Sequence, residues 1–148
     1  RVGSMVQRYL NRPVGPEPLG EAELAALNAA NTGFAQHIGM VITYCSSERL
    51  ESYVDVEPHH LQAAGIVNGG VYASIGETLG SAAAIVTSGR LAVGMSNYTD
   101  LLSSVTQGRI EAVAAPVHIG RSTHLWRIEM RSGDKLVAVT NLKLMILS

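Results

Sequence analysis

The sequence predicts an α+β domain in which an antiparallel sheet wraps around one long helix. Between residues 69 and 86, apolar side chains recur at helical spacing, whereas the segments on either side alternate with the two-residue period of strands. Four strand-like segments follow the helical stretch with no second long helix between them. Successive strands favour antiparallel pairing, and a lone helix is best buried when the sheet curves around it.

Residues 1–33 are expected to form an N-terminal arm with a short helix, ahead of a main domain that spans residues 34–148. The prolines and glycines concentrated between residues 11 and 20 disfavour regular structure. A short helix is expected to begin at Glu21, because this glutamate and the one two positions later would lie in the first turn, where the helix dipole favours negative charge. We expect this helix to end near Asn31.

Two strands are expected between the short helix and the long one. The helical period fades from Met40, and the first strand runs through Cys45. The second strand, within residues 50–57, alternates between two faces, which is typical of a half-buried strand. One face carries Leu50, Ser52, Val54 and Val56, and the other carries Glu51, Tyr53, Asp55 and Glu57.

The long helix carries Val71, Ile75 and Leu79 at the i, i+4, i+8 spacing of one apolar face, with alanines at many later positions. Gly76 and Gly80 would allow the helix to approach the strands closely. The alternative is that they only weaken the helix, by about 1 kcal/mol each relative to alanine.

Strand patterns return after a break at residues 88–90. Their apolar signals are Val93 and Met95, then Ile110, Ala112 and Ala114, then Trp126, Ile128 and Met130, and finally residues 136–146. Trp126 and Met130 share one strand face and are expected in the core. The Ser-Gly-Asp sequence at 132–134 predicts a hairpin turn, and Pro116 predicts a bulge or a sheet edge because proline has no N–H to donate.

Composition narrows the possible functions. The chain has 148 residues, of which 47% are hydrophobic, so one domain with a substantial core is expected. Because 11 basic residues face 12 acidic ones, there is no broad positive field for nucleic acid. A single cysteine, Cys45, excludes an intrachain disulfide and a multi-thiolate metal site and favours a reducing compartment, which we take to be the cytoplasm.

No membrane segment is expected either. Gly76, Glu77 and Gly80 interrupt the longest apolar run before it reaches the roughly 20 residues of a spanning helix. The start of the chain, with Arg1 and Gly3, lacks the apolar region of a secretory signal.

The candidate catalytic residues are expected in the segment from His59 to Glu77. Gly69 and Gly70 leave backbone N–H groups uncovered at the start of the long helix, where the positive end of the dipole suits a developing oxyanion. Asn68 is suited to capping that helix. Without the helix behind it, Asn68-Gly69 would indicate only a hairpin turn.

Glu77 is the candidate catalytic carboxylate. On the expected helix it lies roughly opposite the apolar stripe, on a face of small residues. If another chain closes over this face, the carboxylate becomes partly desolvated and can act as a base or nucleophile. Otherwise it is one more solvated helical glutamate.

Five residues carry a resemblance to a known family, and they match it in identity and spacing: Gln62, Gly69, Gly70, Glu77 and Ser81. The segment resembles the signature of hot-dog-fold thioesterases of the phenylacetyl-CoA and 4-hydroxybenzoyl-CoA type, whose usual pattern is Gln, then His-Gly-Gly, then Glu and a hydroxyl residue. The resemblance extends from about Phe34 to the end of the chain. It implies the hot-dog fold for this domain.

The resemblance also implies a reaction, the hydrolysis of a small aliphatic or aromatic acyl-CoA to the free acid and CoA. By similarity, the Gly69 N–H polarises the thioester carbonyl, and Glu77 attacks it or activates water. Gln62 would position water or the carbonyl, and Ser81 would support the acid. No separate cofactor is implied, because CoA is part of the substrate.

Family sites lie between subunits, so the resemblance implies a homodimer or a tetramer built from two dimers. The segment containing Gly120, Arg121 and Ser122 resembles the stretch that binds the nucleotide end of CoA. Arg121 could hold phosphate oxygens in a fork, and Ser122 adds a hydroxyl. Arg121 is equally open to interpretation as a surface charge. For Arg109, a surface charge is the favoured interpretation.

One departure from the family pattern concerns Asn68, which replaces the family's histidine. Asparagine can cap the helix but cannot titrate near neutral pH, so an acid role is lost. This favours an alternative, a non-catalytic acyl-CoA-binding protein. A hot-dog dehydratase is a third hypothesis, although its Asp and His pair has no convincing match.

The two neighbouring histidines and the cysteine are not expected to take part in catalysis or metal binding. His59 and His60 would point apart on extended chain, and no Asp or Cys completes a ligand set, so no metal site is predicted. Cys45 lies in an apolar strand pattern and is expected to be a buried, inert thiol.

Overall fold

The computed structural model describes residues 4–148. Residues 1–3, which begin the expected N-terminal arm and carry the expectation about a secretory signal, lie outside the described residues. The elements in chain order are α1 (Ser4–Tyr9), α2 (Glu21–Ala30), α3 (Phe34–Ile38), β1 (Val41–Cys45), β2 (Leu50–Asp55), the 3-10 helix η1 (Pro58–His60), α4 (Gly69–Ser88), β3 (Ala92–Leu101), β4 (Arg109–Ile119), β5 (Thr123–Ser132) and β6 (Lys135–Ile146).

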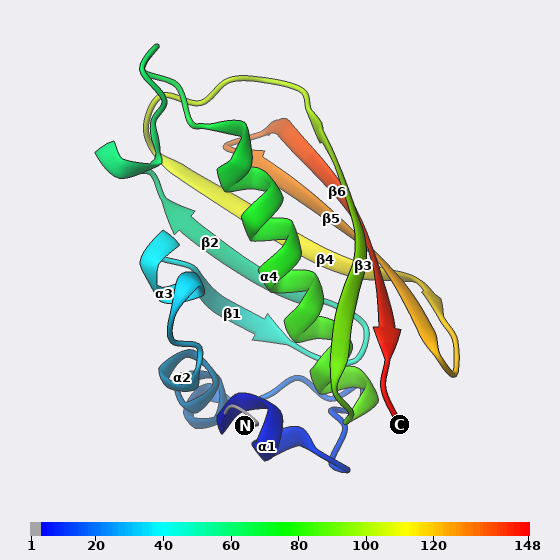
Figure 1. The fold of residues 1–148 in the computed structure, drawn as a ribbon. Coiled ribbons are helices and arrows are strands. Elements are labelled where there is room, and N and C mark those ends of the chain that lie inside the picture. Colours follow the sequence, from blue (N-terminus) through cyan, green and yellow to red (C-terminus); the bar gives the residue numbers. More distant parts are fainter. Residues whose placement is uncertain (1–3) are drawn as a thin grey trace.

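The predicted α+β architecture is confirmed. Six strands form one antiparallel sheet in the order β1-β2-β4-β5-β6-β3. The sheet curves around α4, which lies across its concave face, and α1 and α2 lie together at one end of the molecule (Figure 1). Among residues 4–148, no helix combines the length and apolar character needed to cross a bilayer.

The expected close approach of α4 to the sheet is also confirmed. A Cβ on Gly80 would lie 2.5 Å from Leu142 Cδ2, and one on Gly76 would collide with the side chain of Thr140. Trp126 and Met130 are fully buried beneath the helix, as predicted. Glycine at these two helical positions therefore allows contact with β6 that alanine would prevent.

Several details of the sheet follow the predictions. The face of β2 that begins with Leu50 is buried, and the register of β4 shifts between Pro116 and His118. The pairing of β4 with β2 ends at Ala114, so among the described residues Pro116 has a strand only on its β5 side and also adjoins a bulge. Residues 133–134 form the turn between β5 and β6.

The sequence analysis missed three short helices and was wrong about the two histidines. None of α1, α3 and η1 is longer than six residues, which is too short for a periodic signal in the sequence. His59 and His60 lie in η1 and not on extended chain, with ring centroids 4.2 Å apart. The reason is local, because Pro58 fixes the first helical position and Glu57 caps the turn.

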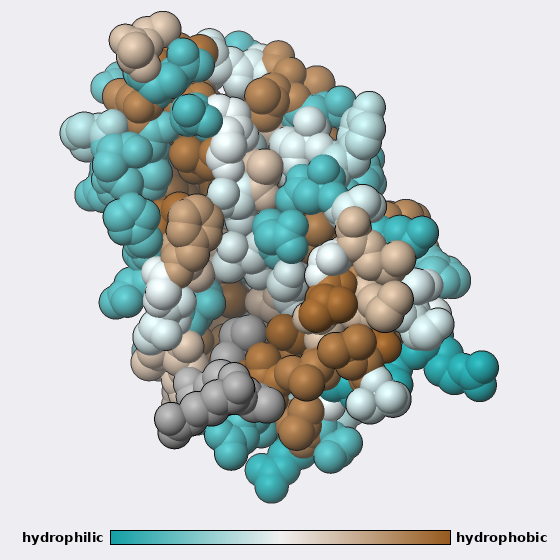
Figure 2. Space-filling model, viewed as in Figure 1, coloured by the Kyte–Doolittle hydropathy of each residue, from teal (hydrophilic) through white to brown (hydrophobic). Residues whose placement is uncertain are grey.

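Strand β3 lies at the edge of the sheet, and within residues 4–148 it pairs with β6 alone. Val93 and Met95, whose apolar character predicted this strand, are 47% and 49% exposed. Tyr98 and Leu101 are more exposed still. Hydrophobic side chains gather over the lower part of this strand in the space-filling view (Figure 2), so the edge is both unpaired and apolar.

Candidate active site

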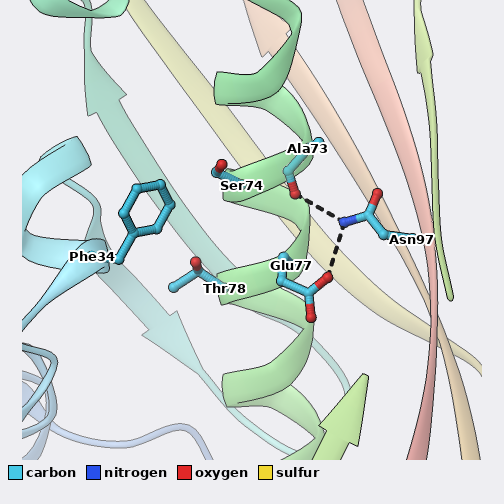
Figure 3. Close-up of a pocket in the computed structure, with 6 residues that line it drawn as sticks. All are labelled: Phe34, Ala73, Ser74, Glu77, Thr78 and Asn97. Atoms are coloured by element: carbon cyan, nitrogen blue, oxygen red, sulfur yellow. Dashed lines mark hydrogen bonds between the residues drawn. The ribbon is translucent and has the colours of Figure 1, made fainter. Parts of the chain in front are cut away.

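Glu77 lies on α4 and faces the edge strand β3. Asn97 Nδ2 donates to Glu77 Oε1 at 3.2 Å and to the carbonyl oxygen of Ala73 at 3.0 Å (Figure 3). Glu77 Oε2 occupies space beside Gly94, where an added Cβ would lie only 2.7 Å away. The carboxylate is therefore half-buried and held by a neighbouring strand, unlike a solvated helical glutamate.

A depression of about 390 Å³ opens beside this carboxylate. Its lining comes from three elements and consists of Phe34, Ala73, Ser74, Glu77, Thr78 and Asn97. Phe34 points at α4 from the side opposite Asn97 (Figure 3). Sequence reasoning missed Phe34, Thr78 and Asn97, and of these only Thr78, next to Glu77 on the helix, carried a signal that could have found it.

The start of α4 has the predicted cap. Asn68 Oδ1 accepts the Gly70 N–H at 2.8 Å. The Gly69 N–H has no acceptor within the described residues. A Cβ on Gly69 would lie 2.6 Å from Leu101 Cδ1, so glycine lets the end of β3 approach the helix.

Gln62 lies close to this helix start. It belongs to a loop closed by the bridge between Leu61 and Val67, and its backbone N–H donates to the Ile66 carbonyl oxygen at 2.9 Å. Gln62 and Gly69 line a second depression of about 260 Å³. The structure thus brings these two predicted site residues together.

The structure does not bring Gly69 and Glu77 together within one chain. They are eight residues apart on a straight helix, which separates them by about 12 Å along its axis. They also line different depressions. One chain therefore cannot present both groups to the same carbonyl.

Ser81 lies one helical turn beyond Glu77 and is half-buried. It is not among the residues that line the depression beside Glu77. No hydrogen bond joins the two side chains in the part of the chain that the structure describes. Its predicted supporting role stays a prediction.

Comparison with known proteins identifies the family. The sequence pattern of the Thioesterase superfamily matches residues 64–139, which include α4 and the strands around Glu77. The chain belongs to this superfamily.

One curated relative is the proofreading thioesterase EntH of Cronobacter sakazakii, which is 35% identical over 108 residues, or 71% of this chain and 79% of EntH. The solved structure of the thioesterase HI1161 of Haemophilus influenzae superposes with a TM-score of 0.81 at 27% identity, covering 91% of this chain and 95% of HI1161. The Escherichia coli PaaI protein, from the phenylacetic acid degradation operon, shares the fold with a TM-score of 0.77 at 22% identity, covering 86% of this chain and 93% of PaaI. As a member of the superfamily, this chain has the hot-dog fold and is a thioester hydrolase.

The segment compared with CoA-binding stretches forms the tight connection between β4 and β5 of this thioesterase. The Gly120 N–H donates to the Thr123 carbonyl oxygen at 2.8 Å, and Arg121 and Ser122 are exposed. Arg90 Nη2 donates to the Arg121 carbonyl oxygen at 2.6 Å, which adds a second guanidinium to this corner. Sequence reasoning missed Arg90, because it is 31 residues away along the chain.

The same corner contains a buried histidine, His124, which is 2% exposed. Its Nδ1 accepts the indole N–H of Trp126 at 3.1 Å. Burial, followed by the charges of Arg90 and His118, lowers the pKa of His124 below its ordinary value. Arg109 lies elsewhere and is paired with Asp55, with Nε and Oδ1 2.7 Å apart.

Cys45 and the histidines of η1 are the remaining candidates, and their contacts indicate structural roles. Cys45 is fully buried, as predicted, and burial raises the pKa of its thiol to about 12, which disfavours the reactive thiolate. His60 Nδ1 accepts the Glu57 N–H at 2.9 Å, so its Nε2 carries the proton that bonds the Ile38 carbonyl oxygen, also at 2.9 Å. Within the described residues, no three His, Cys, Asp or Glu side chains are placed to hold a metal ion.

Proposed function

We propose that this protein hydrolyses small acyl-CoA thioesters to the free acid and CoA, with Glu77 as general base or nucleophile. The observation that carries the proposal is the half-buried Glu77 carboxylate, anchored by Asn97 at the wall of a depression. A carboxylate in such a position can meet a substrate carbonyl, and a second chain that closes over this face would shield it from bulk water.

We further propose that two copies of the chain share each site by pairing their β3 strands. An unpaired, apolar edge strand is a ready template for a second strand. A symmetric antiparallel pair centred near Asn97 and Tyr98 would place the partner's Leu101 opposite Gly94. Because Leu101 contacts Gly69 and Gly94 contacts Glu77, this pairing brings the partner's Gly69 to Glu77.

The proposed reaction needs few groups. A water oxygen attacks the thioester carbon while Glu77 accepts the proton, and the carbonyl oxygen becomes an anion that the partner's Gly69 N–H stabilises. The C–S bond then breaks, and the thiolate leaves readily because a thiol has a pKa of about 8.5. The thiolate regains a proton from the Glu77 carboxyl, and no step calls for a metal or cofactor.

A covalent path uses the same carboxylate. Here a Glu77 oxygen attacks the carbon, the thiolate leaves, and water opens the resulting anhydride. In both paths, Gln62 of the partner would orient water or the carbonyl, because it lies beside Gly69. Asn68 would contribute by holding the helix start that carries the oxyanion donor.

The nucleotide end of CoA is proposed to bind at Gly120, Arg121 and Ser122. Arg90 strengthens this assignment, because its guanidinium adds positive charge next to Arg121. Arg90 follows the C-terminal end of α4, about 20 Å from Glu77 by helical rise. An extended pantetheine arm has to bridge such a distance.

The proposal also covers the oligomeric state and the cellular location. A tetramer would form if two dimers pack through the outer face of the sheet, where Val113, Val117 and Met145 are exposed. A cytoplasmic location is proposed because the one thiol, Cys45, is free and buried.

The deciding experiment compares thiol release from short, medium and aromatic acyl-CoAs by the wild type and Glu77→Gln. The variant is expected to lower kcat by about 10²-fold or more, the contribution typical of a general base. Glu111→Gln, an exposed glutamate on β4, is the matched control and should keep wild-type rates. Full activity in Glu77→Gln would overturn the proposal, and binding of every acyl-CoA without turnover by the wild type would favour the non-catalytic alternative.

A further inference from the structure

Phe34 is an exposed aromatic residue beside the catalytic depression. It is the one phenylalanine of the chain, and it is 60% exposed. Its ring faces the small residues of α4 from the side opposite Asn97 (Figure 3). Phe34 precedes the segment that matches the superfamily pattern, residues 64–139, so the match says nothing of its role.

Two depressions meet at this ring. The first, of about 390 Å³, contains Glu77. The second, of about 350 Å³, is lined by residues that include His37, His59 and Asn68. Phe34 and Ser74 line both, so Phe34 stands at the boundary between them.

We propose that Phe34 is the end wall of the acyl pocket and sets the longest acyl group that the enzyme accepts. The inference rests on the proposed role of Glu77, since it places the thioester carbonyl at that carboxylate. An acyl chain that extends from Glu77 across α4 passes the surface formed by Ala73 and Thr78 and then meets the Phe34 ring (Figure 3).

The chemistry of the two depressions supports this boundary. On the Glu77 side, Phe34 and Ala73 offer apolar surface to methylene groups. Beyond the ring, the lining is more polar than on the Glu77 side, because three histidine rings and the Asn68 amide stand among the apolar side chains of Ile38, Leu61 and Val71. A methylene group gains free energy in proportion to the apolar area that it buries, so carbons past Phe34 gain less than those before it.

The wall is held firmly by its own short helix. Ala35 and Ile38 on α3 are buried, and the helix is bounded by glycines at 33 and 39 that both have positive φ. His60 Nε2–H donates to the Ile38 carbonyl oxygen at 2.9 Å, which ties α3 to η1. These contacts fix the backbone of α3, so the Phe34 side chain starts from a fixed point beside the depression and stands in the way of a longer substrate.

The test measures kcat/KM for a series of straight-chain saturated acyl-CoAs with the wild type, Phe34→Ala and Phe34→Trp. For the wild type, kcat/KM should rise with chain length and then stop rising. In Phe34→Ala, the rise should continue for several more carbons, by up to about fourfold for each added CH₂. In Phe34→Trp, the rise should stop at a shorter chain.

The chain length at which kcat/KM peaks is compared within each variant, so a change in overall rate does not affect the result. Tyr53→Ala, which removes an aromatic ring from the outer side of β2, is the control and should peak where the wild type does. An active wild type whose peak is unmoved in both Phe34 variants would overturn the inference alone. Undiminished turnover in Glu77→Gln would instead overturn the function on which it rests.

Discussion

Asn97 shows how a single residue can orient the proposed catalytic carboxylate of Glu77 from a distant part of the chain. Its amide N–H₂ bridges Glu77 and the Ala73 carbonyl oxygen, and its own oxygen accepts the Thr99 hydroxyl at 2.7 Å. Thr99 in turn contacts Thr140 at 2.7 Å. The carboxylate is thereby connected through β3 to β6, which limits the positions that it can adopt.

His124 makes stability depend on pH. Its pKa in the folded state lies below the ordinary value, because of burial and the charges of Arg90 and His118. Above about pH 6.5 the histidine is neutral in both the folded and the unfolded state. Below that pH the unfolded chain takes up the proton first, so the free energy of unfolding should fall by up to about 1.4 kcal/mol per pH unit until the folded pKa is reached.

Urea unfolding of the wild type and His124→Gln between pH 5 and pH 8, about the range in which histidines titrate, measures this effect. Glutamine can still accept the Trp126 N–H, so the variant should mainly remove the titration. The free-energy difference between the two proteins should change with pH. A constant difference would contradict the prediction, and His37→Gln, an exposed histidine outside this corner, serves as the control.

Helix α4 packs closely against β6 because two of its glycines leave room for the side chains of that strand. The gain in helix propensity on replacing Gly76 by alanine is about 1 kcal/mol. The new methyl group would collide with Thr140, and overpacking typically costs 1–3 kcal/mol in a close-packed core. Collision should outweigh propensity, because Thr140 is fully buried and has little room to move.

We therefore predict that Gly76→Ala lowers the free energy of unfolding by about 1–2 kcal/mol, as measured by urea denaturation. Gly15→Ala is the control, because an added Cβ there meets nothing within 4 Å. An unchanged or raised stability of Gly76→Ala would mean that the helix and the sheet can separate at no cost.

At the scale of the whole molecule, the separation of about 12 Å between Gly69 and Glu77 along the helix predicts that active sites form only between chains. Gly69→Pro removes the N–H that would stabilise the oxyanion while suiting the first helical position, because Asn68 already has the extended backbone that precedes a proline. It should lower kcat by about 10²–10³-fold, as loss of one oxyanion donor does. Gly69→Ala keeps the N–H and controls for contact with Leu101.

Mixing the two inactive proteins gives the sharper measurement. If Glu77 and Gly69 act across the subunit interface, a dimer of one Glu77→Gln chain and one Gly69→Pro chain retains one intact site of two. After subunits exchange in an equal mixture, activity should recover to about a quarter of the wild-type value. No recovery after proven exchange would mean that both groups serve the same site from one chain.

The sequence by itself determined the long helix, the strands and several of the residues that line the candidate site. Burial of one face produces the helical period of Val71, Ile75 and Leu79 and the alternation that begins at Leu50. Both patterns can be recognised from residues that are close together in the chain. The Asn68 cap is likewise a contact between neighbours in sequence. Such features can be predicted because their causes lie within a few residues.

Tertiary structure alone decided which surfaces meet. Asn97, Phe34 and Arg90 lie beside predicted site residues only because the sheet folds around α4 and brings α3 and β3 to opposite sides of Glu77. The same fold leaves the apolar edge of β3 unpaired and separates Gly69 from Glu77 along the helix. These relations depend on contacts between residues far apart in the chain, so no local period or motif could encode them.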